Sequence, residues 1–146
     1  MKELFVHELR TMLDVEQRLA KDVLPGLRER AHAAGLRRAL DRHLLETEEH
    51  VENLRRVFAF TGEPLVPRDA ELPEPAAGND VEILVSTLRT EALEVASYTF
   101  LVHAAQALAV DEDAVRLLRL NMEQDAYALE EAEKELAKLL AEKVES

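Results

Sequence analysis

Apolar residues recur at intervals of three and four along most of the chain, a spacing that places them on one face of an α-helix. In the first stretch the series is Phe5, Leu9, Met12, Leu19 and Val23. Equivalent series continue through the rest of the sequence. Together they predict four helices, over 2–22, 36–60, 80–108 and from 111 through 139.

Two short breaks and one long one divide these helices. Pro25-Gly26 is expected to kink or interrupt the first helix before a further turn or two to Ala34, with Gly35 as its C-cap. The second short break precedes Asp111-Glu112-Asp113, an acidic first turn that suits the positive end of the helix dipole. Each short break predicts an antiparallel pair of helices.

The long break holds four of the five prolines, Pro64, Pro67, Pro73 and Pro75, and predicts an extended connection over about 62–79. Asn79 with Glu82 resembles a capping box that starts the third helix. We expect a single domain, 1–146, in which the crossover runs along the bundle and the third helix enters at the end where the first does. One long crossover in an antiparallel four-helix bundle is the ferritin-like connection.

Composition supports an all-α class, because the chain has only six aromatic residues and Gly 4 while 47% of its residues are hydrophobic. The net charge of −12 argues against nucleic acid and anionic membranes as partners. Zero cysteines exclude thiolate catalysis, disulfides and iron–sulfur clusters. No signal peptide and no apolar run of membrane-spanning length is evident, so the expected location is the cytoplasm.

Several polar residues occupy helix positions where an apolar residue is expected. Counted from each helix start they fall at a similar depth, so a bundle would bring them to one level. Carboxylates from two helices and carboxylate–imidazole pairs from the others are how di-iron and di-manganese bundles are built, and such ligands suit iron or manganese. The candidate ligands are Glu16, Glu46, His50, Glu91, Glu94 and Asp125.

Each candidate also has a structural interpretation. Glu16 can lie at the edge of its stripe and pair with Arg18 or with an arginine of the second helix, and Glu46 can belong to a solvated acidic face. His50 can donate to a helix carbonyl at the edge of the core, while His43 is better explained as a supporting or structural residue. Of the two carboxylates on the third helix, one is expected to face inward.

Sequence segments spread over most of the chain resemble one bacterial family. They are Leu4-Phe5-Val6-His7-Glu8-Leu9-Arg10, Val15-Glu16-Gln17-Arg18-Leu19, Leu24-Pro25, the run from His43 to Leu54, Val57-Phe58, and Glu91-x-x-Glu94-x-x-x-Tyr98. These resemble the YciE/YciF-type ferritin-like proteins, which are stress-associated and of unknown biochemical activity. The resemblance implies a ferritin-like bundle, often dimeric, with a suspected metal site and an association with oxidative or osmotic stress.

By position the resemblance reaches Glu16, Glu46, Glu91 and Glu94. The chain departs from the family at His50, where the family often has Gln. It also has Ala92 where a histidine is expected, and the last helix lacks an acidic residue one turn after Asp125, where Leu129 stands.

These features support an iron or manganese carboxylate site with an oxidase or peroxide-related role in stress, and no residue is assigned as catalytic. The alternative is a metal-free, homodimeric helical scaffold or interaction protein in the stress response. Mineral storage would need a cage of many subunits, and nothing in the sequence indicates one.

Overall fold

The structure, a computed structural model, describes residues 1–72 and 78–145. Every regular element in this part of the chain is helical, which confirms the predicted all-helical bundle. The elements are α1 (Lys2–Arg18), the π-helix η1 (Leu19–Val23), α2 (Leu24–Arg30), α3 (Ala34–Thr61), α4 (Asp80–Ala107) and α5 (Glu112–Glu145).

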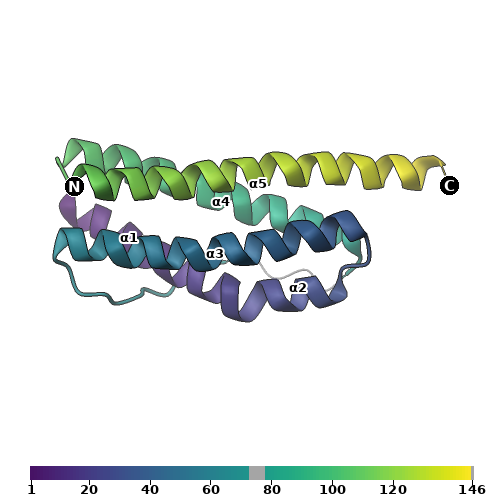
Figure 1. Ribbon diagram of the computed structural model, residues 1–146, viewed down its shortest axis with the longest axis horizontal. Helices are drawn as coiled ribbons and strands as arrows, with labels where there is room; N and C mark the ends of the chain where they lie inside the picture. Colours follow the sequence, from purple (N-terminus) through teal and green to yellow (C-terminus); the bar gives the residue numbers. More distant parts are fainter. Residues whose placement is uncertain (73–77, 146) are drawn as a thin grey trace.

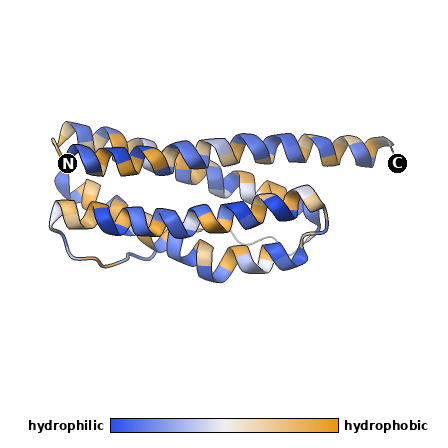
Figure 2. Cartoon of the chain, viewed as in Figure 1, coloured by the Kyte–Doolittle hydropathy of each residue, from blue (hydrophilic) through white to orange (hydrophobic). Residues whose placement is uncertain are grey.

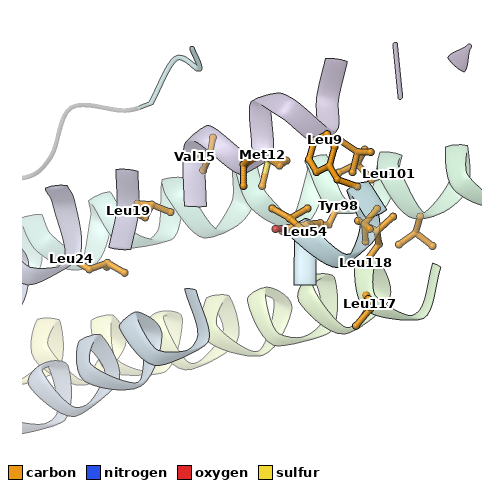
Figure 3. Packing of buried hydrophobic residues seen from close by; sticks show 14 of the residues in the cluster. Leu9, Met12, Val15, Leu19, Leu24, Leu54, Tyr98, Leu101, Leu117 and Leu118 are labelled. Atoms are coloured by element: carbon orange, nitrogen blue, oxygen red, sulfur yellow. The ribbon is translucent and has the colours of Figure 1, made fainter. Parts of the chain in front are cut away.

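The helices lie side by side along one long axis, with α4 against α5 and α1 against α3 (Figure 1). The start of α1 lies at the same end as the close of α3 and the α4–α5 turn, so α1 and α5 run opposite to α3 and α4. Apolar stripes alternate with polar ones along the helices (Figure 2). The apolar stripes form a single core that includes Leu9, Leu54, Leu101 and Leu118 (Figure 3).

The break expected at Pro25-Gly26 lies one turn earlier. Pro25 and Gly26 are both inside the first turn of α2, and the preceding turn widens into η1, where the Leu24 N–H donates to the Leu19 carbonyl five residues back. Proline has no N–H, and its ring clashes with the carbonyl four residues before it. Pro25 therefore explains why the α-helical ladder gives way to a π turn at this point.

The expectation that Gly35 caps the first helix is wrong, since Gly35 lies in the first turn of α3. The chain turns at Ala31 and Ala33, which have extended backbone conformations. The Asp80 carboxylate accepts hydrogen bonds from the N–H groups of His32, at 2.9 Å, and Ala33, at 2.7 Å. This acceptor from a distant part of the chain fixes the turn, and no local sequence signal predicts it.

The connection between α3 and α4 begins at Gly62, whose φ of +73° closes α3 in the left-handed conformation that favours glycine. Residues 63–72 form no helix and follow α1, where the Arg68 N–H donates to the Arg10 carbonyl at 3.1 Å and the Ala70 N–H to Asp14 Oδ2 at 2.8 Å. The predicted crossover prolines Pro73 and Pro75 lie outside the described residues.

The third long helix, α4, starts as predicted, with the Asn79 side chain accepting the Glu82 N–H at 3.1 Å. Its place in the bundle differs from the prediction. Asp80 binds the turn before α3, so α4 begins at the end where α3 begins, opposite the start of α1. A crossover that leaves α3 beside the start of α1 and follows the length of α1 must arrive at the opposite end. No helix in the part of the chain that the structure describes is long and apolar enough to cross a membrane.

Candidate metal centre

Midway along the bundle, all four long helices contribute carboxylate or imidazole side chains to its interior. Glu16, His50, Glu91 and Glu94 are 0% exposed, Asp125 is 1% exposed and His43 is 5% exposed. They come from α1, α3, α4 and α5, at 11 to 16 residues from the helix starts except for His43, which lies about two turns before His50 on α3. One of the two α4 carboxylates was expected to face inward. In the structure both do.

These side chains form two overlapping groups in which one ligand atom from each member lies within 4.8 Å of those of the others. Glu94 and Asp125 belong to both groups. His50 and Glu16 complete the first group, whereas His43 and Glu91 complete the second. The arrangement offers two adjacent positions for a cation, with two carboxylates common to both.

The imidazoles contact the carboxylates directly. His50 Nδ1 lies 3.3 Å from Glu16 Oε2 and 3.7 Å from Asp125 Oδ1, and His43 Nε2 forms an ion pair with Glu91 Oε1. Arg18, the partner considered for Glu16, binds Asp14 and the Ala70 carbonyl instead. The edge-of-stripe interpretation of Glu16 is therefore wrong.

Apart from the contacts with His43 and His50, the oxygens of the buried carboxylates, in Glu16, Glu91, Glu94 and Asp125, lack a hydrogen-bond donor among the described residues. No lysine or arginine in the described part of the chain forms an ion pair with them. A buried carboxylate without a donor or a positive charge is strongly unfavourable. The donor set, carboxylate oxygen with imidazole nitrogen, fits a divalent transition-metal cation.

The electrostatics of the cluster reflect this concentration of negative charge. Burial, together with the neighbouring carboxylates, raises the pKa of Glu94 and of Asp125 well above their ordinary values. Burial alone would lower the pKa of His43 and His50, but Glu91 beside the first and Glu16 beside the second raise it above the ordinary value. Without a cation the cluster therefore favours holding extra protons.

A second layer of polar side chains orients His50. Gln124 Oε1 lies 2.7 Å from His50 Nε2 and accepts its N–H, so Nδ1 is the nitrogen that faces Glu16 and Asp125 and would be free to bind a cation once it loses its proton. Nearby, Asn121 Nδ2 donates to the Tyr98 hydroxyl at 3.2 Å. Tyr98 is fully buried, and its ring meets that of His50 edge to face.

Gln124, Asn121 and the inward position of His43 were not predicted from the sequence. A signal for the first two was present, because both share the inward side of the last helix with Asp125. Glu46, by contrast, is half-buried and belongs to neither group. It lines a cavity of about 20 Å³ with Arg42, His43 and Glu131, next to the centre.

The chain is similar to one protein family and to several solved structures. A family model described as a domain of unknown function (DUF892) matches residues 1–146. YcfI of Rhodopseudomonas palustris, described as a putative structural protein, is 26% identical and has a TM-score of 0.81, over 91% of this chain and 92% of its own.

Two further solved structures share the fold at lower identity. The Escherichia coli stress protein YciF is 20% identical with a TM-score of 0.80, over 96% of each chain. A Xanthomonas campestris protein is 18% identical with a TM-score of 0.78, over 98% of this chain and 95% of its own. No curated protein matches the chain.

Proposed function

The chain belongs to the DUF892 family, the YciE/YciF type of domain whose function is unknown, and from this membership and the buried cluster we propose that it binds two iron or manganese ions inside a ferritin-like four-helix bundle. Glu16 and His50 would hold one ion, and His43 and Glu91 the other. Glu94 and Asp125 would contact both.

The observation that carries this proposal is the set of buried carboxylates without donors. A structural role would need a partner for each charge, and the described residues supply only two imidazoles. Two divalent cations would balance the four carboxylates and complete their coordination. Iron or manganese in such a site supplies one-electron redox chemistry, which suits an oxidase or peroxide-related role in stress.

Anaerobic titration with Fe(II), and separately with Mn(II), tests the proposal on protein purified without chelators and then stripped of metal. We expect two ions per chain for the wild type. Glu94→Gln removes a carboxylate common to both groups while conserving volume, and should weaken binding by more than the roughly hundredfold that is the upper range for loss of a residue that only supports a ligand. Elemental analysis of the protein as purified reports which metal it carries.

The matched control is Glu49→Gln, an exposed glutamate on the same helix as His50. Glu46→Gln examines the remaining predicted ligand, and its position outside both groups predicts binding close to that of the wild type. Wild-type protein that binds Fe(II) and Mn(II) no better than Glu94→Gln would rule out the metal site.

A homodimeric scaffold is the second candidate function. YcfI is described as a putative structural protein, and two large apolar side chains are exposed on neighbouring helices here, Leu45 at 68% and Tyr127 at 51%. Tyr127 lies under the Arg42 guanidinium of α3. Light scattering on protein eluted from a size-exclusion column gives the oligomeric state. If the protein is a metal-free scaffold, a chelator should leave its melting temperature unchanged.

A further inference from the structure

A small cavity between α3 and α5, which lie side by side (Figure 1), joins the surface to the candidate metal centre. Its volume is about 20 Å³, enough for one water-sized group. Its buried end is His43, which is 5% exposed and belongs to the second of the two ligand groups. Toward solvent it is lined by Arg42, which is exposed, and by Glu131, whose side chain is 31% exposed. The cavity therefore leads from solvent to a candidate ligand.

Glu46 is the carboxylate of this cavity that lies within electrostatic range of the centre. Burial raises its pKa, and the charges of His43, His50 and Glu91 are among those that also act on it. It is half-buried, and none of the ion pairs in the described part of the chain involves it. It nevertheless belongs to neither ligand group. A carboxylate that attracts a cation without being placed to hold it is suited to passing the cation on.

Arg42 adds a positive charge to the same lining. Its guanidinium lies 5.4 Å from the centre of the Tyr127 ring, which is 51% exposed, so this contact keeps the charge at the solvent end of the cavity. Arg42 and Glu46 are four residues apart on α3 and therefore lie on the same face of the helix. The cavity thus carries one group that attracts a divalent cation and another that repels it.

A second cavity touches His43 from the side of η1, and it offers a cation no such attraction. Its volume is about 10 Å³, and besides His43 its described lining consists of leucine, valine, serine and threonine side chains. A divalent cation that approached His43 past these side chains would lose its hydration water and gain no charged ligand in exchange, which is strongly unfavourable. Approach from the cavity between α3 and α5 is therefore favoured.

We propose that the cavity between α3 and α5 is the entrance by which a divalent cation reaches the metal centre, with Glu46 drawing the cation in and Arg42 limiting its entry. This inference deepens the proposed function and rests on it. It gives Glu46 a role in the rate of binding and not in the final coordination. A residue that lowers the barrier to entry lowers the barrier to exit equally, so Glu46 should affect both rates and leave the Kd nearly unchanged.

Two anaerobic measurements with Fe(II) separate these quantities. Titration gives the Kd, and an excess of a coloured Fe(II) chelator added to loaded protein gives the rate constant of release. The rate constant of entry is the rate constant of release divided by the Kd. Glu46→Gln removes the charge while conserving volume, and should slow entry by roughly tenfold, the lower end of what a charged cleft adds to an association rate, and release in proportion. Arg42→Gln should accelerate both, and added salt should reduce both effects because it screens the charges.

The matched control for the charge is Glu49→Gln, an exposed glutamate on α3 that does not line the cavity, and it should keep both wild-type rates. Ala128→Leu narrows the cavity from α5 without changing its charge, so it should slow entry and release at any salt concentration. Its control is Ala20→Leu, a half-buried alanine outside the cavity lining. The Ala128 variant also keeps the entrance testable if Glu46→Gln does not fold.

Failure of the entrance is distinguishable from failure of the metal site. If the wild type binds no Fe(II), the metal site and its entrance are both wrong. If Fe(II) binds but either Glu46→Gln or Ala128→Leu leaves both rates unchanged, the entrance is wrong and the metal site stands. A Kd that rises in Glu46→Gln because release becomes faster would make Glu46 a ligand and overturn the role assigned to it here. Arg42→Gln that does not accelerate entry would contradict the electrostatic account.

Discussion

Gln124 decides which nitrogen of His50 faces the carboxylates. Its carbonyl oxygen accepts the Nε2–H, so Nδ1 faces Glu16 and Asp125 and carries the lone pair when the ring is neutral. We expect Gln124→Leu to free the ring and to lower metal affinity by roughly tenfold to a hundredfold, as is typical when the partner of a ligand histidine is lost.

Nitrogen NMR of His50 in the metal-free protein measures the tautomer directly, and Fe(II) titration measures the affinity. Gln106→Leu, an exposed glutamine on α4, serves as the control. If Gln124→Leu leaves both the tautomer and the affinity unchanged, Gln124 has no part in orienting His50.

At the scale of single helices, two glycines should respond in opposite directions to the same substitution. Gly62 ends α3 with a φ of +73°, where an added Cβ is strained although nothing lies within 4 Å of it. Gly26 is helical in α2, and its added Cβ would meet Arg30 Nη1 at an ordinary 3.5 Å. Gly62→Ala should lower the free energy of unfolding by about 1–2 kcal/mol, and Gly26→Ala should raise it by about 0.5–1 kcal/mol.

Urea denaturation of both variants beside the wild type measures these changes. The strain argument at Gly62 fails if its alanine variant is as stable as the wild type, and the helix-propensity argument at Gly26 fails if that variant is less stable.

The helix ends that could be predicted are those with a local signal. Asn79 and Gly62 behave as their sequence contexts indicate, because a cap or a left-handed residue acts within one turn. The turn before α3 could not be predicted, since it depends on Asp80, which is 47 and 48 residues from its two partners. The interruption of the first helix was predicted only to within one turn and not as a π turn, because Pro25 disrupts the ladder before itself and not at its own position.

The range over which a sequence signal acts also determines which residues of the candidate site could be predicted. Glu16 and Asp125 interrupt apolar stripes, so the helical period made them candidates for burial, whereas it did not decide between Glu91 and Glu94. His43 and Glu46 lie within one turn of each other on α3. The helical period alone allows either side chain to lie at the edge of the apolar stripe. Packing against α4 decides this, because Glu91 lies opposite His43.

At the scale of the whole molecule, the net charge of −12 has two different origins. Most of it lies on solvated helix faces such as the glutamates of α5 near Lys134, where exposed ion pairs contribute little to stability. A few carboxylates lie in the core without donors, and they destabilise the metal-free bundle. Metal binding would therefore be expected to stabilise the fold by mass action.

The buried groups also give the metal-free protein a pH dependence with a definite sign. Glu94 is faced by Glu16 of α1, His43 and His50 of α3, Glu91 of its own helix and Asp125 of α5. The folded pKa values of Glu94 and Asp125 lie well above the unfolded values of about 4. The folded state thus binds more protons than the unfolded state, and the free energy of unfolding falls as pH rises from about 4 through the folded pKa values.

Each such proton changes the slope by up to about 1.4 kcal/mol per pH unit. His43 and His50 act in the same direction at higher pH, because their folded pKa values are raised above about 6.5. Glu94→Gln removes one titrating group, so the metal-free variant should match the wild type near pH 4 and become progressively more stable than it toward pH 8. Urea denaturation in the presence of a chelator measures this divergence, with Glu49→Gln as the control that should follow the wild type. Parallel curves for Glu94→Gln and the wild type would mean that the Glu94 carboxylate is not desolvated by the bundle.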